Sequence, residues 1–237
     1  MNPVNHPTQT FYKNAYLYFI LAMAITLFAF MPSYFTRLGK TDGAHHFHGI
    51  TATLWMLLLI IQPLLYRLKR FTWHRNVGKL SFVLVPLIIV GGLKMVSTMI
   101  MGQEHYPPNV VYQLAFIDFV TLSLFLLYFV LAIVHRKNVQ LHARYMVCTV
   151  LGPLLPAVTR LLFIFPIVTT FHQSLNISYL LIEFTLFLLL LHDKRSGKIY
   201  VPYVAAMVAF LVQHVLMNFA SEWLWWRKSM DLFAQWF

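Results

Sequence analysis

Seven apolar stretches constrain the fold of this chain more than any other feature. They cover residues 15–31, 47–65, 80–101, 110–134, 145–168, 175–191 and 200–220. Each is long enough, as a helix, to cross a hydrocarbon layer about 30 Å thick. Backbone groups inside a bilayer must bond within their own segment, and a helix satisfies this requirement. The pattern predicts an all-α fold, a bundle of seven transmembrane helices forming a single integral membrane domain over residues 1–237.

The composition excludes a water-soluble domain and favours the lipid bilayer as the partner. Of 237 residues, 59% are hydrophobic and 11% are charged, whereas soluble domains carry about 45–50% and about 25%. The net charge of +11 comes mainly from basic residues in short loops. Topology explains these residues better than nucleic-acid binding, so no nucleic acid is expected. The single cysteine, Cys148, excludes an intramolecular disulfide and a cysteine-based zinc knuckle.

The loop charges predict a cytoplasmic N-terminus and an external C-terminus. With this orientation, four basic loop or tail residues lie outside: Arg37, Lys40, Arg227 and Lys228. Twelve lie in the cytoplasm: Lys13, Arg67, Lys69, Arg70, Arg75, Lys79, Arg136, Lys137, Arg144, Lys194, Arg195 and Lys198. Such a bias is typical of cytoplasmic loops. After the last span, aromatic residues at three- and four-residue spacing predict a short C-terminal interfacial helix.

Charged residues inside the apolar stretches are the strongest candidates for a functional site. Each costs at least about 2.5–3.5 kcal/mol near the bilayer centre, so it is usually paired or functional. Lys94, Asp118, Arg160 and Glu183 lie about 10–12 Å below the outer face, counted at about 1.5 Å per residue. We expect the two acids to neutralise the two bases in a polar cavity open to the outside, which Gln62, Gln213 and Asn218 would also line. The alternative is a purely structural set of interhelical contacts.

The chain has 11 histidines, and their placement suggests a metal or haem site. Imidazole is a common ligand for zinc, copper and iron. The candidate ligands are His48 and His214, together with His45, His46, His74 and His142. Histidines at a membrane interface are also tolerated without a ligand role. On the cytoplasmic side, His142 and Met146 share a helix face, whereas Arg75 and Arg144 are typical of contacts with anionic lipid.

Several of these residues belong to motifs that resemble a known family. The runs "HGITATLWMLLLIIQPLL", "WHRNVGKLSF" and "HARYM", followed by Arg160, are similar to a family of bacterial polytopic membrane proteins of unknown function. The shared pattern comprises His48, Gly49, Gln62, His74, Arg75, Gly78, His142, Met146 and Arg160, and covers about residues 45–165. The resemblance implies the bacterial inner (cytoplasmic) membrane but no particular activity. A looser likeness to cytochrome b561-type bundles implies haem ligands near both membrane faces.

Three functions are compatible with the sequence. The first is a metal ion (Zn, Cu or Fe) or haem b protein, with His48 and His214 at an outer site and His74 and His142 at an inner one, giving transmembrane redox transfer. The second is a carrier or receptor that uses the charged cavity for protons or a small polar molecule. The third is a zinc-dependent lipid hydrolase, similar to the adiponectin-receptor and alkaline-ceramidase superfamily. Each allows a homo-oligomer or a subunit of a membrane complex.

Overall fold

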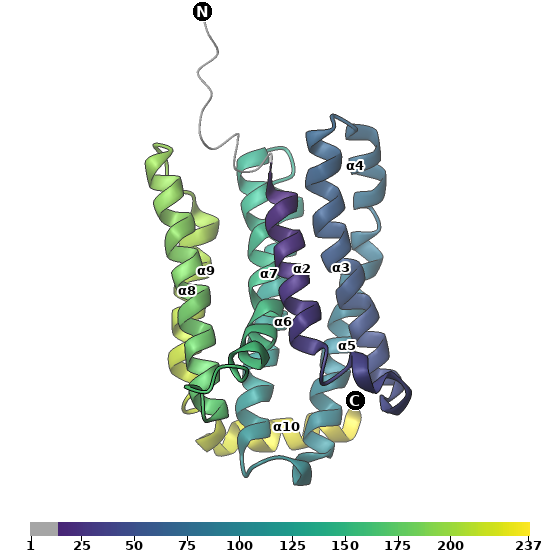
Figure 1. Ribbon diagram of the computed structural model, residues 1–237, viewed down its shortest axis with the longest axis vertical. Helices are drawn as coiled ribbons and strands as arrows, with labels where there is room; N and C mark the ends of the chain where they lie inside the picture. The colour runs from purple at the N-terminus through teal and green to yellow at the C-terminus, as the bar shows by residue number, and fades with distance from the viewer. Residues whose placement is uncertain (1–13) are drawn as a thin grey trace, which may run out of the picture.

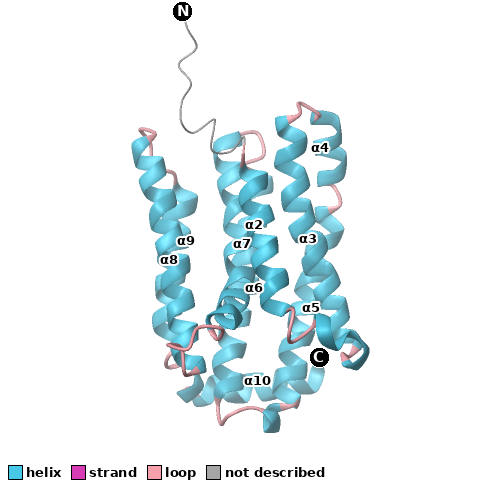
Figure 2. Ribbon diagram, in the orientation of Figure 1, coloured by secondary structure: helices cyan, strands magenta, loops and turns pink. Residues whose placement is uncertain are grey.

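The computed structural model describes residues 14–237, and within this range the chain is helical and contains no strand (Figure 2). The long helices run alternately up and down in chain order (Figure 1): α2 (Ala15–Phe30), α3 (Gly43–Arg67), α5 (Ser81–Met101), α6 (Val110–Val134), α7 (Val139–Leu162), α8 (Phe171–Arg195) and α9 (Val201–Met217). The short helix α4 (Phe71–Gly78) follows α3 at one end of the bundle. We name this the α4 end, and the opposite end, where α10 (Leu224–Trp236) lies, the α10 end.

Five helical segments are long and apolar enough to cross a membrane: Gly43–Arg67, Phe71–Met101, Val110–Val134, Val139–Leu162 and Phe171–Arg195. The chain is therefore an all-helical membrane protein. Helices α2 and α9 are also apolar but shorter, with 16 and 17 residues. The expected span 145–168 is wrong at its end, since α7 stops at Leu162. Pro166 explains the difference, because proline disfavours helical geometry at the residue before it and has no N–H to continue the ladder.

Helix α7 occupies the centre of the bundle and contacts α2, α6, α8 and α9. One apolar cluster joins α6 and α7 to α8 and α9, and a second joins them to α2, α3 and α5. Close approach of α6 and α7 depends on Gly152, because a Cβ there would lie 2.3 Å from Thr121 Cγ2. Helices α6 and α7 therefore contribute to both apolar clusters and connect the two halves of the bundle.

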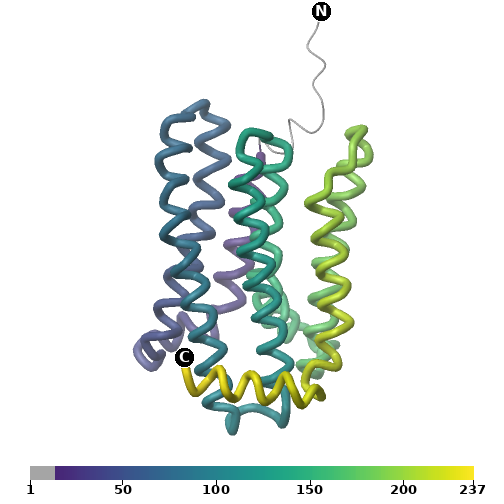
Figure 3. Tube along the Cα trace, turned by 180° about the vertical axis from the view of Figure 1, so that it is seen from behind, coloured from purple at the N-terminus to yellow at the C-terminus, as the bar shows by residue number. Residues whose placement is uncertain are grey.

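Helix α10 lies across the α10 end of the bundle (Figure 3). It packs on α5 and α6 through Trp226, Met230 and Ala234. The Trp226 indole donates from Nε1 to the Tyr112 carbonyl oxygen at 2.8 Å, and the Tyr112 hydroxyl lies 2.8 Å from Asp231 Oδ1. The predicted short C-terminal helix is present, and its location in the membrane interface stays a prediction.

The turns that carry most of the basic residues gather at the α4 end. The connections α3–α4, α6–α7 and α8–α9 all lie there because the helices alternate in direction (Figure 1). Lys13, which belongs to the same predicted set, lies outside the described residues. Within the part of the chain that the structure describes, Asp193 is the one acidic residue at this end. The charge asymmetry inferred from the sequence is therefore an asymmetry between the two ends of the bundle.

Candidate functional site

The imidazole of His214 on α9 is held between two side chains of α8. His214 Nδ1 lies 2.9 Å from Glu183 Oε1, and His214 Nε2 lies 3.0 Å from Asn176 Oδ1. The ring stacks on Tyr179 with a centroid distance of 4.7 Å and an interplanar angle of 12°. The side chains of His214 and Glu183 are only 16% and 10% exposed. We call these four residues the His214 cluster.

The hydrogen bonds of the His214 cluster determine where its protons lie. Asn176 donates from Nδ2 to the His172 carbonyl oxygen at 2.8 Å, which leaves Asn176 Oδ1 as the acceptor facing His214. His214 Nε2 must therefore carry a proton. The Nδ1–Glu183 hydrogen bond then holds one further proton, either on an imidazolium beside a carboxylate or on a carboxylic acid beside a neutral ring. Both arrangements keep every hydrogen bond, so the proton can move without rearranging the site.

Asp118 and Arg160 lie near this cluster without forming the predicted ion pair. Asp118 on α6 is close enough to Arg160 and Tyr179 for its charge to act on both. Arg160 instead donates from Nη1 to the Pro156 carbonyl oxygen at 3.0 Å, and its guanidinium carbon lies 4.4 Å from the Phe30 ring centroid. No salt bridge within 4.0 Å joins Asp118 to a basic group among the described residues. Arg160 is exposed on the bundle surface rather than buried in a cavity.

Of the other residues expected to line the cavity, some lie beside the His214 cluster and others do not. Gln213 is buried and donates from Nε2 to the Ile117 carbonyl oxygen at 2.9 Å and to Thr121 Oγ1 at 3.1 Å. Asn218 donates to the His214 carbonyl oxygen at 2.7 Å, so both residues lie beside the cluster. Lys94 does not: its side chain is exposed and donates from Nζ to the Phe237 backbone oxygen at 2.7 Å. The expectation that Glu183 neutralises Lys94 or Arg160 is wrong, because Glu183 pairs with His214.

The three histidines near the start of α3 have separate surroundings. His45 Nδ1 pairs with Asp42 at 2.8 Å, and His46 Nδ1 lies 2.9 Å from the Tyr34 hydroxyl. His48 Nδ1 is buried and has no hydrogen-bond partner among residues 14–237. Successive residues of a helix point about 100° apart, so His45 and His46 leave α3 in different directions and bond to different groups. Within the described range, no group of three or more His, Cys, Asp or Glu side chains is placed to hold a metal ion.

At the α4 end, Gln62 joins α3 to α4. With its amide oriented to satisfy both groups, Gln62 donates to His74 Nδ1 at 2.6 Å and accepts from the Gly78 N–H at 3.0 Å. The motif residues Gln62, His74 and Gly78 are thus together, far from the cavity in which Gln62 was expected. His74 Nδ1 also lies 3.2 Å from the Gln62 backbone carbonyl oxygen, so this nitrogen faces Gln62 rather than the bundle interior.

The other cytoplasmic motif residues have separate environments. His142 Nδ1 lies 2.8 Å from the Ala132 carbonyl oxygen and therefore donates to it. Met146 packs between the two apolar clusters, and Arg75 is exposed. The structure therefore does not assemble His142, Met146 and Arg75 into one site.

A buried ion pair between Arg144 on α7 and Asp193 on α8 was not predicted. Both side chains are 0% exposed, and Arg144 Nε lies 2.9 Å from Asp193 Oδ2 while Nη2 lies 2.5 Å from Oδ1. Arg144 Nη1 also donates to Gln140 Oε1 at 2.6 Å, and the Tyr200 ring centroid lies 3.8 Å from the guanidinium carbon. The signal in the sequence was an acid in the basic run "HDKRSGK". Arg144 was expected at the lipid surface, and that expectation is wrong.

The fold and these contacts define the class: an all-helical membrane protein with a protonatable cluster inside its bundle. No family model, curated protein or solved structure matches the chain. The likeness to a bacterial polytopic family therefore rests on the motifs alone.

Proposed function

We propose that this protein is a seven-span membrane carrier that moves protons through the His214 cluster. The supporting observation is the His214–Glu183 hydrogen bond, a proton shared between two titratable groups inside an apolar bundle. An ionisable pair at this depth is costly to bury and is usually retained for function. Histidine is also the side chain whose ordinary pKa lies closest to physiological pH.

The surroundings of the pair suit proton exchange rather than permanent charge. Asp118 on the facing helix α6 supplies a second carboxyl group near Tyr179 and forms no salt bridge with any residue in the range 14–237. Stacking on Tyr179 and the hydrogen bond to Asn176 hold the His214 ring in one orientation. The fixed ring can exchange a proton with Glu183, and Asp118 provides a second carboxyl group near the Tyr179 ring on which His214 stacks.

The same proposal includes the topology. Helices α2 and α9 are about 24 Å and 26 Å long at about 1.5 Å per residue, and tilting or thinning of the bilayer accommodates short spans. Seven crossings place the basic α4 end in the cytoplasm and the α10 end outside, with the N-terminus inside, in a bacterial inner membrane. Reporter fusions after Gly78 and Phe237 test this: cytoplasmic activity at Gly78 and external activity at Phe237 support it, and the same side for both overturns it.

Proton transport is measured in liposomes that contain the purified protein and an internal pH-sensitive dye. Potassium and valinomycin clamp the membrane potential. We expect the wild type to dissipate an imposed pH gradient, and His214→Gln and Glu183→Gln to slow this by at least about tenfold. His172→Gln is the matched control, because His172 is an exposed histidine at the same end. Wild-type vesicles that leak no faster than empty vesicles overturn the proposal, as does a His214→Gln rate equal to that of the wild type.

A haem or metal site is the second candidate, and one contact favours it. The hydrogen bond from His142 Nδ1 to the Ala132 carbonyl oxygen directs Nε2 away from the backbone, as is typical of histidine ligands. The outer pair does not fit, because both ring nitrogens of His214 are engaged. A visible spectrum and metal analysis of protein purified in mild detergent test this candidate, with His142→Ala as the diagnostic variant. A Soret band or bound metal lost in that variant supports the site, and neither in the wild type excludes it.

A further inference from the structure

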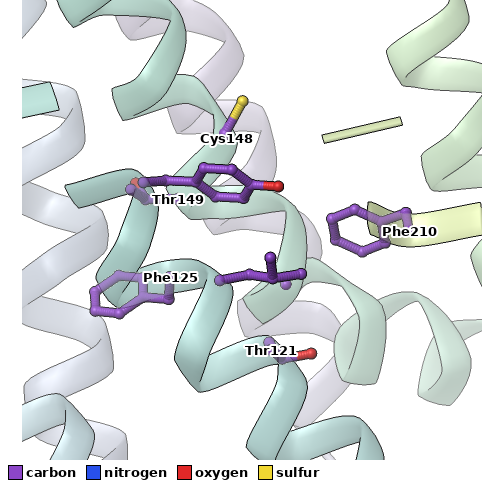
Figure 4. Close-up of a pocket in the computed structure, with 8 residues that line it drawn as sticks. Thr121, Phe125, Cys148, Thr149 and Phe210 are labelled. Carbon is purple, nitrogen blue, oxygen red and sulfur yellow. The ribbon is translucent and has the colours of Figure 1, made fainter. Parts of the chain in front are cut away.

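A small cavity lies in the middle of the bundle, between α6, α7 and α9 (Figure 4). In Figure 4, Phe210 of α9 and Phe125 of α6 lie on opposite sides of it, with Thr121 of α6 below and Cys148 and Thr149 of α7 above. It has room for about one water molecule. A cavity of this size inside a close-packed apolar core calls for an explanation.

Two of the polar groups at this cavity indicate what occupies it. The hydroxyl of Tyr128, a residue that is only 3% exposed, lines the cavity and has no hydrogen-bond partner among the described residues. Thr121 Oγ1 accepts from Gln213 Nε2 at 3.1 Å, which leaves the Thr121 hydroxyl proton free to donate. A buried hydroxyl without a partner is costly, and a water that joins two such groups removes that cost.

The cavity is positioned to extend the proton path from the His214 cluster. Asp118, Thr121 and Tyr128 lie three, seven and ten residues apart on α6, so they follow one face of that helix. Asp118 is near Tyr179 of the His214 cluster, and Tyr128 lies farther toward the α4 end. The unpaired hydroxyl thus lies beyond the cluster in the direction of the cytoplasmic end in the proposed topology.

We propose that this cavity is a water-binding site, and that its water relays protons between Tyr128 and Thr121. The water accepts one proton from the hydroxyl on one side and releases a different proton to the other side, so atoms and charge balance at each step. Toward the α4 end, the Asp118 carboxyl group supplies a proton to the Thr121 oxygen, and Thr121 gives its own proton to the water. The water gives a different proton to the Tyr128 oxygen, and Tyr128 gives its own proton to solvent water that enters from the α4 end. This inference rests on the proposed proton transport and names its route toward the α4 end.

The transport arm of the test uses Tyr128→Phe and Thr121→Val, which remove hydroxyls and little volume. We expect both variants to slow proton transport by at least about tenfold, as expected for His214→Gln. Tyr145→Phe is the matched control, because the Tyr145 ring lies 6.5 Å from that of Tyr128 but does not line the cavity. Active wild type with undiminished Tyr128→Phe and Thr121→Val overturns the relay and leaves the proposed function standing. Inactive wild type overturns the proposed function instead.

The second arm detects the water directly and does not depend on transport. Radiolysis in ¹⁸O-labelled water modifies side chains that contact bound water, and mass spectrometry locates the label. We expect label at Tyr128 and Cys148, although Cys148 is 1% exposed, and none at Met217, which is 0% exposed and outside the cavity. Thr121→Val should reduce the label at Cys148. Equal label at Met217 and Cys148, or no label at either cavity residue, overturns the water site.

Discussion

Asp193→Asn should destabilise the protein strongly, because it leaves the Arg144 guanidinium buried without its counter-charge. In the folded protein Arg144 makes a two-pronged contact with Asp193 and neither side chain reaches solvent. After the change Arg144 retains Gln140 and the face of the Tyr200 ring. Removing one partner of a buried ion pair typically costs about 3–5 kcal/mol. For a chain of this length, that loss lowers the melting temperature by about 6–20 °C.

Thermal unfolding in mild detergent, followed by circular dichroism, measures the loss. Asp42→Asn is the control, because Asp42 pairs with the side chain of His45 but is 56% exposed. The double variant Arg144→Met with Asp193→Leu should recover most of the stability, since it removes both charges and fills the space. A loss for Asp193→Asn below about 1 kcal/mol, the value typical of exposed ion pairs, would refute the reasoning.

Three further predictions concern the helix ends and contacts. The hydrogen bond from the His45 backbone N–H lowers the pKa of Asp42 below its ordinary value of 3.8, so this cap stabilises α3 above that pH and is lost as the pH falls through the lowered pKa. On that acidification the exchange rate of the His45 amide should rise relative to its rate in the unfolded chain, and Asp42→Ala should remove the dependence. Gly152→Ala should cost about 1–3 kcal/mol in thermal unfolding because its Cβ meets Thr121 Cγ2, and adding Thr121→Ser should recover part of it, whereas Gly43→Ala meets nothing within 4 Å. Trp226→Phe should release α10 by removing the bond to Tyr112, so trypsin should cut sooner after Arg227, whereas Trp225→Phe, at a residue that is 63% exposed, should leave the rate unchanged.

The sequence predicted where the long helices lie because each of them follows an apolar run, but it missed the end of α7, which stops at Leu162 ahead of Pro166. The common level expected for Lys94, Asp118, Arg160 and Glu183 stays a prediction, although Glu183 does contact His214, which was expected at a similar depth. The sequence could not predict their partners, because pairing depends on the direction in which each side chain leaves its helix. Lys94 shows the consequence: its long stem carries the ammonium group to the α10 end rather than into the bundle.

Gln62 and Asp193 show two other limits of reasoning from periodicity. His48, Trp55 and Gln62 share a helix face at seven-residue spacing, yet His48 and Gln62 lie about 21 Å apart along the axis. Sharing a face therefore did not mean sharing a site, and Gln62 bonds to α4 instead. Asp193 lies in the last turn of α8, and the basic residues next to it in the sequence made it look like a solvent-exposed residue. Only the turn to α9, which brings Tyr200 N–H within 3.3 Å of Asp193 Oδ2, encloses it.

The two buried ionic contacts of α8 differ in a way that assigns them different roles. Arg144 stays protonated at any pH the protein meets, and its forked contact with Asp193 fixes the α4 end of α8 against α7. His214 and Glu183 share a single hydrogen bond, and each of them can hold or release the proton between them. Ten residues of α8, about 15 Å along its axis, separate Asp193 from Glu183. The first contact can therefore hold the helix rigid while the second changes protonation state, as the proposed proton transport requires.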